Sequence, residues 1–491
     1  MNKKKENFET TILNNSVKLA IVSDLHYGTN SSNPNCRGEI ADILLQRIVF
    51  RLNRLVHPDI TLVLGDVLDD VSSRDAEKKL LHIKSILDKL ESPYIIIPGN
   101  HDCGAEIMED ICGIRFLSFI DNEEPGFNAS RSPEDLARFR KARKNYSGPI
   151  ISLQHACLLP PGRSEVPHNY TNANEIISVM KELGVFLSIS GHYHKGSETV
   201  RDGNVTFINA PGLCEAPFPY TVININRGQI QRYRQELAMD ANLQLCDNHI
   251  HTQLAYCNDN IIVDKAIALA GFFGLSGLSF TEHSGQLYFE KKQYWDKTCL
   301  KEGMSAARNK DNRMAEYLKL KHTYQQSTVR FGLEVDCDYK GNLLLKKSDL
   351  SDFNYIIGAM HGLPGLNKDI APSKKDADDY LSILEKLLVK NIDVLAHPFR
   401  VFRRCGWIAP QELFLNVANL LRKYNTAAEI NFHTNEPPVE FIRICLNQGV
   451  KFSLGSDAHQ MAEIGDFAYH LSLLKEAGFD GDLTDILLPT E

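Results

Sequence analysis

The first half of the chain alternates short, largely β-branched apolar runs with longer segments of helical periodicity. The runs cover residues 17–22, 60–64, 94–97, 150–153 and 185–189. Runs this short, often bounded by Gly or Pro, predict strands that are buried on both faces. Residues 39–56 and 75–90 have helical spacing, so we expect a βαβα order. Three further runs, 205–208, 220–225 and 229–233, alternate as antiparallel strands would.

The pattern restarts near residues 234–245 and continues through the second half. The apolar runs there are residues 277–280, 329–333, 355–358, 393–395, 428–430 and 452–454. Each run leads into a polar residue, and helical periodicity, as in residues 261–269, lies between runs. This order favours a closed α/β barrel with a site at the carboxyl ends of its strands, and an open sheet is the alternative. Residues 286–328 are a lysine-rich, mostly helical excursion that we interpret as a solvated face.

The length of 491 residues is too great for one hydrophobic core. We predict an N-terminal tail at residues 1–15, a first domain at 16–235, a linker at 236–243 and a second domain at 244–485. Both domains are expected to be of the α/β class, because both alternate strands with helices.

The composition is that of an ordinary globular protein, with 43% hydrophobic and 24% charged residues and a formal net charge of -8. An acidic chain is a poor candidate for sequence-independent attraction to nucleic acid, although a local basic groove is an alternative. The eleven cysteines include no Cys-x-x-Cys pair, and we recognise no signal peptide or membrane-spanning run. We therefore expect a cytoplasmic protein without a membrane partner.

Histidines, carboxylates and amides gather where the strands of the first half end. They read Asp24-x-His26, Gly65-Asp66-x-x-Asp69, Gly99-Asn100-His101-Asp102, His155 and Gly191-His192-x-His194. Because the carboxyl ends of successive strands converge on one edge of an α/β sheet, we expect these side chains to meet. Carboxylates and imidazoles together form binuclear metal sites, in which a metal-bound hydroxide attacks phosphorus.

This first set resembles the five motifs of the calcineurin-like metallophosphoesterases, in the family's order and over about residues 16–235. The resemblance implies a four-layered α/β sandwich that binds two divalent ions. By the family pattern, Asp24, His26 and His194 bind one ion, Asn100, His155 and His192 bind the other, and Asp66 bridges them.

The same resemblance assigns catalytic roles to His101, Asp66 and Asp102. His101 is expected to contact the scissile phosphate and to protonate or stabilise the leaving oxygen. Asp102 is expected to orient His101. Asp69, which the family pattern includes, is expected to form hydrogen bonds within its loop.

A second set of the same residue types follows the strands of the second half. It reads His249-x-His251, Glu282-His283, Glu334, His361, His397, Glu429-x-Asn431 and Asp457-x-His459. Side chains two residues apart in an extended segment share a face, so His249 and His251 are expected to point toward the same barrel mouth.

This second set resembles the PHP domain, named for polymerases and histidinol phosphatases, over about residues 244–485. The resemblance implies a distorted (β/α)7 barrel with two or three divalent ions. His249, His251 and Asp457 would bind the first ion, and Glu334 would bridge to a second ion that also binds His361 and His397. A third ion would take His283, His459 and a further histidine six residues after the His-x-His pair.

The chain departs from the PHP pattern at this third ion. Cys257 stands in place of the further histidine, and Glu282 stands where aspartate is usual. Cys257 as a thiolate ligand, Asp259 as a substitute and an empty site remain three open interpretations. We keep Glu282 among the candidate metal ligands.

Basic residues near the two sets are candidates for phosphate binding. Arg400 and Arg403, with Arg404 beside them, follow His397, and a guanidinium matches phosphate oxygens. Arg163 and Lys195 have the corresponding positions near the first set, and solvated basic loops are the alternative for both groups. His168 and His433 have no motif support, and we interpret them as ordinary polar histidines.

The two resemblances together predict a bifunctional metal-dependent phosphoester hydrolase. The first domain would open a phosphodiester, with cyclic and nucleotide-derived esters as the candidates, and the second would act as a phosphatase or phosphodiesterase. The alternatives are a nuclease that processes DNA or RNA ends and a regulatory protein with one silent domain. The ligand types fit manganese, iron or zinc, the expected partner is a small phosphorylated substrate, and a homo-oligomer stays open.

Overall fold

A computed structural model describes residues 16–29, 33–102, 104–433 and 437–489. The predicted tail, residues 1–15, lies outside them. The chain forms two compact units, which meet in sequence between Ala238 and Met239. None of the described helices is long and apolar enough to cross a membrane.

The first unit contains two β-sheets. The order of the five-stranded sheet is β13 (Gln229–Glu236), β12 (Pro219–Asn226), β1 (Val17–Val22), β2 (Ile60–Leu64), β3 (Tyr94–Ile97). The order of the six-stranded sheet is β10 (Val200–Asp202), β11 (Val205–Asn209), β9 (Val185–Ser190), β8 (Ile150–Leu153), β5 (Ile114–Ser118), β4 (Met108–Ile111). A small separate hairpin pairs β6 (Asn122–Glu124) with β7 (Asn128–Ser130).

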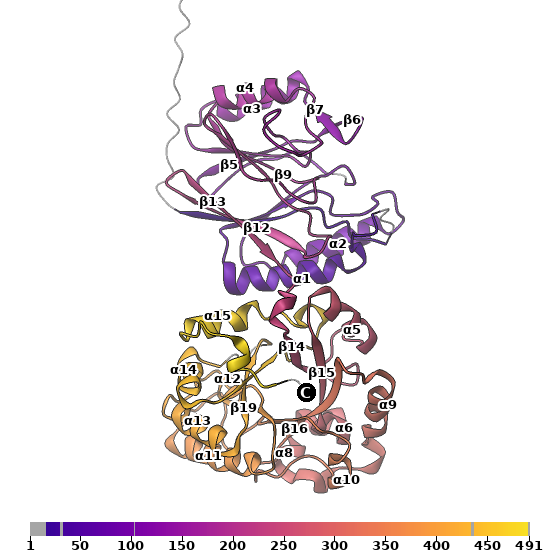
Figure 1. The fold of residues 1–491 in the computed structure, drawn as a ribbon, viewed down its shortest axis with the longest axis vertical. Helices are drawn as coiled ribbons and strands as arrows, with labels where there is room; N and C mark the ends of the chain where they lie inside the picture. Colours follow the sequence, from indigo (N-terminus) through magenta and orange to yellow (C-terminus); the bar gives the residue numbers. More distant parts are fainter. Residues whose placement is uncertain (1–15, 30–32, 103, 434–436, 490–491) are drawn as a thin grey trace, which may run out of the picture. The chain divides into compact units, whose positions relative to one another are not determined.

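Helices cover the outer faces of these two sheets and complete four layers (Figure 1). The helices of the first unit are η1 (Gly38–Ile40), α1 (Ala41–Arg51), η2 (Leu52–Val56), α2 (Ala76–Leu87), α3 (Pro133–Arg143) and α4 (Ala173–Glu182). The sheets pack on each other through apolar side chains such as Leu19, Leu62 and Leu187, all fully buried. The predicted sandwich is therefore present.

The strand β11 differs from its prediction. Its alternation of apolar and polar residues indicated an antiparallel strand, and it does pair antiparallel with β10, but it pairs parallel with β9. Thr206, the polar residue of the run, is buried like its neighbours. The alternation therefore does not mark a solvent-facing side, which is what the prediction assumed.

The second unit contains one seven-stranded sheet whose strands pair in parallel. In spatial order the strands are β14 (Cys246–Ile250), β15 (Gly277–His283), β16 (Val329–Asp336), β17 (Ile356–Ala359), β18 (Val394–Leu395), β19 (Ala427–Asn431) and β20 (Phe452–Gly455). A bridge between Ile250 and Ala458 joins the two ends of the sheet. The predicted barrel is thus nearly closed.

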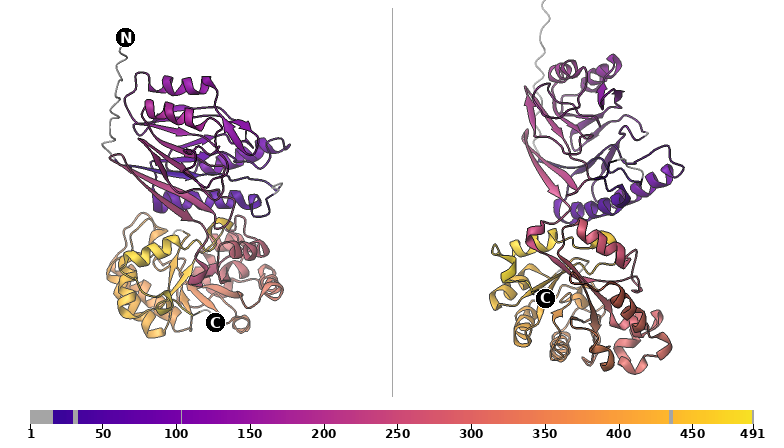
Figure 2. Two further views of the ribbon diagram at one scale, coloured as in Figure 1. Left: turned by 45° about the horizontal axis from the view of Figure 1, so that its top comes forward. Right: turned by 45° about the vertical axis from the view of Figure 1, so that its right-hand side comes forward.

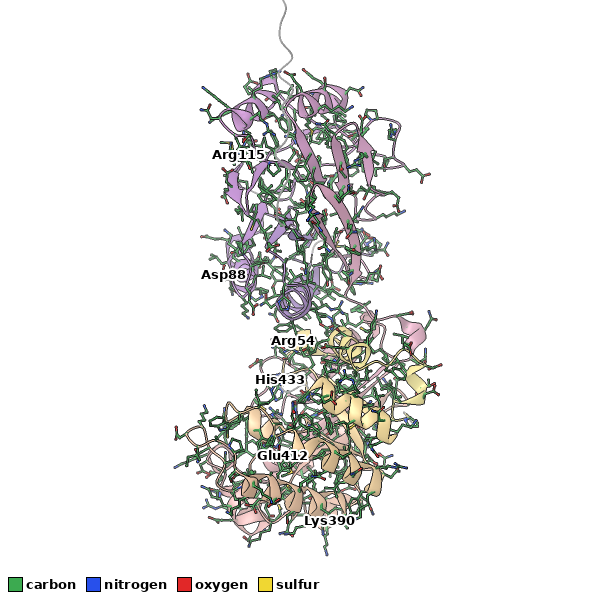
Figure 3. All side chains as sticks on the ribbon, turned by 90° about the vertical axis from the view of Figure 1, so that its left-hand side faces the viewer. Arg54, Asp88, Arg115, Lys390, Glu412 and His433 are labelled. Carbon is green, nitrogen blue, oxygen red and sulfur yellow. The ribbon has the colours of Figure 1, made fainter. Side chains whose placement is uncertain are left out.

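Helices surround this barrel (Figure 2). They are α5 (Val263–Phe272), α6 (Ser284–Tyr288), α7 (Lys291–Trp295), α8 (Thr298–Glu302), α9 (Met314–Tyr324), α10 (Lys347–Leu350), α11 (Lys374–Leu388), α12 (Arg400–Arg403), α13 (Glu412–Tyr424), α14 (Val439–Gln448) and α15 (Ala468–Glu476). Short 3-10 turns occur at Ala241–Leu243, Gly303–Ala306, Asn309–Asp311, Met461–Glu463 and Leu483–Asp485. Lys390, just after α11, and Glu412, which begins α13, lie on the outside (Figure 3).

The excursion at residues 286–328 is more than the solvated face that we predicted. Tyr294 and Trp295 at the end of α7, together with Leu300 in α8, line a cavity of about 410 Å³ that also contacts His361. Lysine content indicated solvent exposure, but Leu300 is buried and Tyr294 is half-buried, while Trp295 stays exposed at the edge of the cavity. This segment therefore forms one wall of the space beside the second polar cluster.

Candidate metal centres

The strand ends of the first unit bring the first predicted set together. Asp24 and His26 follow β1, and Asp66 follows β2. In the other sheet, His155 follows β8 and His192 follows β9. Since β1, β2, β8 and β9 run so that their carboxyl ends meet at one edge, side chains far apart in sequence become neighbours.

Asp66 lies at the centre of this first cluster. Its Oδ2 is 3.1 Å from His155 Nε2 and 3.6 Å from His26 Nε2. His155 Nε2 lies 3.1 Å from His192 Nδ1, and His26 Nε2 lies 3.2 Å from His194 Nε2. Asp66 is therefore between two imidazole pairs, which is the position that a bridging carboxylate requires.

Asp24 completes one side of the cluster. Its Oδ1 is 3.5 Å from His194 Nε2 and 4.0 Å from His26 Nε2, and this buried oxygen has no hydrogen-bond partner among the described residues. Ligand atoms around one ion with bonds of about 2.1 Å stand about 3–3.5 Å apart. The residues present therefore fit a divalent metal ion.

The backbone at these positions is unusual. Asp24, His26, Asp66 and His192 have φ angles of 54°, 49°, 49° and 70°, in the left-handed region that residues with a Cβ rarely adopt. Gly99 is necessary beside them, because a Cβ there would lie 2.1 Å from Asp66 Oδ1. Backbone conformations of this kind concentrate at functional sites.

Backbone and carboxylate acceptors fix the orientation of two imidazoles. The Nδ1–H of His155 donates to the Leu64 carbonyl at 2.7 Å, which leaves Nε2 for the cluster. His194 Nδ1 lies 2.7 Å from Glu215 Oε1. Glu215 was not predicted from the sequence, because the loop after β11 carries no motif that marks it.

The environment of His101 differs from the prediction. Its Nδ1–H donates to the Asp69 carbonyl at 3.1 Å, whereas Asp102 accepts backbone N–H groups from Val67, Leu68 and Gly99. Asp69 therefore orients His101, in keeping with its expected loop role. Asp102 instead joins the loops that follow β2 and β3.

Asn100 is the most exposed of the predicted ligands of the first cluster. It follows Gly99 in the loop after β3, and it is exposed. The neighbouring backbone is nevertheless attached to the cluster, since the N–H of His101 donates to Asp66 Oδ1 at 3.0 Å.

Charges in the first cluster are strongly coupled. Burial raises the pKa of Asp66, but the imidazoles of His155 and His26 outweigh it and hold the pKa below its ordinary value. Burial also opposes protonation of His155, yet Asp66 raises the pKa of this histidine to about 10. Protons on imidazoles thus balance the carboxylates, a role that a metal cation also fulfils.

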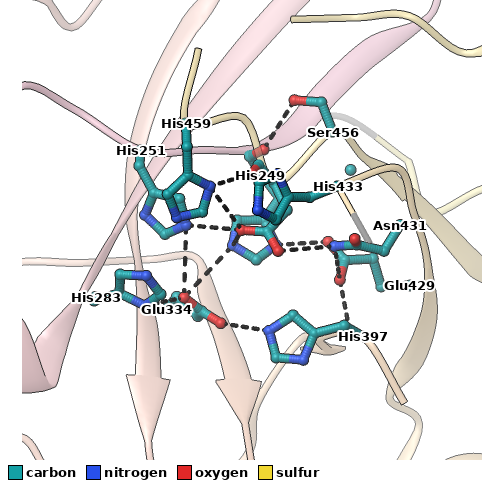
Figure 4. A network of polar contacts seen from close by, with 12 residues as sticks. His249, His251, His283, Glu334, His397, Glu429, Asn431, His433, Ser456 and His459 are labelled. Atoms are coloured by element: carbon teal, nitrogen blue, oxygen red, sulfur yellow. Dashed lines mark hydrogen bonds and ion pairs between the residues drawn. The ribbon is translucent and has the colours of Figure 1, made fainter. Parts of the chain in front are cut away.

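Glu334 is the centre of the second cluster (Figure 4). It lies on β16 and is fully buried. Its Oε1 is 2.7 Å from His397 Nε2 and 3.3 Å from His361 Nε2. Its Oε2 contacts His283 Nδ1 and lies 3.6 Å from His249 Nε2. One carboxylate therefore faces imidazoles from β14, β15 and the loops after β17 and β18.

Asp457, in the loop after β20, forms the other side of this cluster. Its Oδ1 lies 2.9 Å from His251 Nε2 and 3.5 Å from His249 Nε2. Its Oδ2 accepts a hydrogen bond from Arg400 Nη1 at 3.0 Å. His397 and Asp457 have φ angles of 30° and 51°, so left-handed backbone recurs at this site.

A layer of carboxylates supports the histidines from behind. His249 Nδ1 lies 2.6 Å from Glu429 Oε1, and His361 Nδ1 contacts Asp336. Glu429 Oε2 also accepts the backbone N–H of His397 at 2.6 Å. Glu429 belonged to the sequence pattern, but Asp336 was missed, although it shares a strand face with Glu334.

His283 and His459 converge with His251, as the third set of the pattern implied. The ring centroid of His251 lies 4.0 Å from that of His283 and 4.4 Å from that of His459. One ring nitrogen of each of these three histidines lies within 4.8 Å of the others. This group lies beside a cavity of about 220 Å³.

Glu282 and Cys257 have surroundings that the sequence did not indicate. Glu282 Oε2 accepts hydrogen bonds from Thr252, and its Oε1 lies 3.4 Å from His251 Nδ1, so it supports this histidine from behind. Cys257 Sγ accepts a hydrogen bond from Gln286 Nε2 at 3.3 Å, and burial raises the pKa of its thiol to about 12.

The second cluster also fits divalent ions. His249 Nε2 is buried without a hydrogen-bond partner among the described residues, and it faces Glu334 Oε2 across 3.6 Å. Burial opposes protonation of His251, but Asp457 and Glu282 raise its pKa to about 9. Burial lowers the pKa of His397 to about 3. Such ions require neutral imidazoles beside ionised carboxylates, so His397 is already in the form that binds metal, whereas His251 must first lose a proton.

The predicted substrate-binding residues separate into two groups. Arg163 and Lys195 line one cavity of about 740 Å³. Tyr193, the middle residue of the His192-x-His194 motif, lines the same cavity. Arg400 lies within the second cluster, but Arg403 lines a different cavity with Phe399 and Trp407. The lining of the cavity beside the second cluster includes Arg404 rather than Arg403, so the placement of Arg403 differs from the one that we expected.

Comparisons with known proteins agree with this geometry. Residues 17–196 match the Calcineurin-like phosphoesterase family, and residues 247–433 match the PHP domain family. A Deinococcus radiodurans protein named "Probable histidinol-phosphatase" is 26% identical over 260 residues, which cover 48% of this chain and 94% of that protein. A Caldicellulosiruptor saccharolyticus protein named "Probable phosphatase" is 24% identical over 153 residues, covering 30% of this chain and 59% of that protein.

Solved structures also include similar proteins. A dimetal phosphatase from Danio rerio has 16% sequence identity and a TM-score of 0.36, and the match covers 45% of this chain and 98% of that one. Both matched families are metal-dependent. The chain therefore contains a calcineurin-like phosphoesterase domain followed by a PHP domain, and it is a hydrolase that acts on phosphoric esters.

Proposed function

We propose that the chain is a bifunctional hydrolase, in which the first unit opens a phosphodiester and the second unit removes phosphate from the resulting monoester. The observation that carries this proposal is the pair of separate clusters, each with buried carboxylates between converging imidazoles. Each cluster lies wholly within one unit. Two complete donor sets support two reactions rather than one.

In the first unit we assign Asp24, His26, His194, Asn100, His155 and His192 as metal ligands, with Asp66 as the bridge. In the second unit we assign His249, His251, Asp457, Glu334, His361 and His397, with His283 and His459 for a further ion. Manganese, iron or zinc suits these donors. When bound, such ions supply an activated water and neutralise charge on the phosphoryl group.

We assign proton delivery in the first unit to His101. The Asp69 carbonyl holds its Nδ1, so Nε2 is the atom that faces the leaving oxygen. The ring of His101 lies 5.3 Å from that of His26, which places it beside the donor set. A half-buried imidazole in this position can give a proton to the leaving group and recover one from solvent.

An aromatic rim beside the first cluster supports a flat group in the substrate. The Phe127 side chain is 69% exposed, and its ring lies 6.1 Å from that of His192 and 5.4 Å from that of His168. His168 also donates to the Gly126 carbonyl, which fixes this turn beside the cluster. An exposed aromatic ring in such a place favours stacking by a nucleobase or another aryl group.

The second unit has the features of a site for a small phosphomonoester. Arg400 and Arg404 line the cavity of about 220 Å³ beside the histidines, where guanidinium groups would bind the phosphate. Lys297, Lys368 and Trp295 line the adjoining cavity of about 410 Å³. The remainder of the substrate would occupy this second space.

The full-length variants Asp66→Asn and Glu334→Gln test the proposal on a panel of linear diesters, cyclic nucleotides and phosphomonoesters. Asp66→Asn is expected to lose hydrolysis of diesters and keep hydrolysis of monoesters. Glu334→Gln is expected to accumulate the monoester. If either variant still converts a diester completely to alcohol and phosphate at the wild-type rate, the proposed division of labour is wrong.

A further inference from the structure

We propose that His433 binds the third ion of the second unit, in place of the histidine that the chain replaces with Cys257. The proposal rests on the metal-dependent function proposed for this unit. His433 follows β19, and no motif marks it, which is why the sequence indicated an ordinary polar histidine. The structure places it within the polar cluster (Figure 4).

The position of the His433 ring matches those of the neighbouring candidate ligands. Its centroid lies 4.5 Å from that of His459, with an angle of 30° between the rings. This separation falls between those of the pairs His251 with His459, at 4.4 Å, and His251 with His249, at 5.2 Å. His433 therefore packs on the group as its members pack on one another.

A carboxylate orients His433 as carboxylates orient other candidate ligands. His433 Nδ1 lies 2.9 Å from Glu463 Oε1. The corresponding distances are 2.6 Å for His249 with Glu429 and 2.7 Å for His194 with Glu215. Ligating histidines usually bond their second ring nitrogen to such a carboxylate, which leaves Nε2 of His433 as the donor for an ion.

Glu463 connects His433 with His459 directly. It is 3% exposed, and its Oε2 accepts the backbone N–H of His459 at 2.9 Å. The His459 Nδ1–H donates to the Asp457 carbonyl at 2.7 Å, so its Nε2 is likewise directed away from the backbone. One buried carboxylate thus contacts the imidazole of His433 and the backbone of His459.

The cavity beside these histidines supplies the space for an ion. It measures about 220 Å³, and its lining includes Cys257, His283, His433 and His459. Cys257 Sγ accepts a hydrogen bond from Gln286. His433 uses only its Nδ1 for the contact with Glu463, so its second ring nitrogen remains as the donor. An imidazole therefore replaces the missing one from a different strand of the barrel.

The test measures metal content of the full-length chain after removal of metal and titration with Co²⁺. His433→Ala is expected to bind about one equivalent less than the wild type. Cys257→Ala, which alters the same cavity, is the matched control and is expected to keep the wild-type content. Glu463→Gln is expected to weaken the last equivalent by about 10–100-fold, because it removes the orienting carboxylate.

The Co²⁺ spectrum provides a second readout that does not depend on activity. The wild type is expected to show no thiolate-to-cobalt charge-transfer absorption, since Cys257 would not be a ligand. Circular dichroism checks the fold of each variant, and His433→Gln replaces His433→Ala if the latter fails to fold.

Retention of full metal content by both His433 variants would overturn the inference. Charge-transfer absorption that Cys257→Ala abolishes would overturn it as well, in favour of a thiolate ligand. If the wild-type second unit bound no Co²⁺ at all, the proposed metal-dependent function of this unit would fail instead. The experiment therefore separates the two failures.

Discussion

The two clusters use the same donor types but differ in enclosure. In the first unit the donors come from two sheets, and the side chains of His26 and His194 are 10% and 20% exposed. In the second unit they come from one barrel, and the side chains of Glu334, His249 and Asp457 are fully buried. We therefore propose that the first site takes a larger ester that enters from solvent and that the second takes a small one.

The carboxylates that contact the candidate histidine ligands from behind are also more deeply buried in the second cluster than in the first. The described residues of the first cluster include Glu215, which is 26% exposed, behind one histidine. In the second cluster Glu429, Asp336 and Glu463, all nearly or fully buried, stand behind separate histidines. Because orienting partners raise metal affinity, we expect the second unit to bind its ions more tightly than the first.

The largest effects are expected from removal of the central carboxylates. Asp66→Asn should lower diesterase activity by more than about a hundredfold and leave monoesterase activity unchanged, because loss of a ligand exceeds loss of its supporting partner. Glu334→Gln should do the reverse. Steady-state kinetics on one diester and one monoester measure both, and a loss of both activities in either variant would contradict the independence of the sites.

Replacement of the supporting carboxylates should sharpen the contrast. Glu429→Gln is expected to weaken metal binding in the second unit by about 10–100-fold. Glu215→Gln should have a smaller effect in the first unit, since water can replace a partner that is 26% exposed. Competition with a chelator measures both affinities, and equal losses would show that burial does not explain the difference.

Metal binding should weaken as pH falls. In the metal-free protein the pKa of His155 is about 10 and that of His251 is about 9, so an ion must displace a proton at neutral pH. Below these pKa values each displaced proton lowers the apparent affinity by up to about tenfold per pH unit. Titration of the two single-site variants between pH 6 and about pH 8 measures this slope, and a flat profile would contradict proton displacement.

The smallest effect is expected at the aromatic rim of the first site. Phe127→Leu should raise KM for an aryl or nucleotide diester by about tenfold, because stacking contributes about 1–3 kcal/mol per base. Phe127→Tyr is the control and should retain the wild-type KM. An equal change in KM for an alkyl diester would show that Phe127 acts on the loop rather than on the substrate.

The sequence predicted the strands whose ends carry the candidate donors, but no pattern marked β4, β5, β6, β7 or β10. Short apolar runs that end in Asp24, Asp66 or His397 indicate both a buried strand and the edge where its side chain lies. The barrel and the four layers follow from the alternation of these runs with helices. Register and partner direction do not follow from it, as the parallel pairing of β11 with β9 shows.

Residues that contact the donors from loops could not be predicted. Glu215 reaches His194, and Glu463 reaches His433 from 30 residues away, through turns whose conformation no local pattern specifies. The same applies to Arg403 and Arg404, which are adjacent in sequence but line different cavities. Side-chain direction after a short helix depends on tertiary packing.

Elemental analysis of the full-length wild type, Asp66→Asn and Glu334→Gln tests the central claim of two separate metal centres most directly. The account predicts about two equivalents in the first unit and two or three in the second, so each variant should lose only the metal of its own unit. Loss of all metal from one substitution, or no loss from either, would contradict two independent centres.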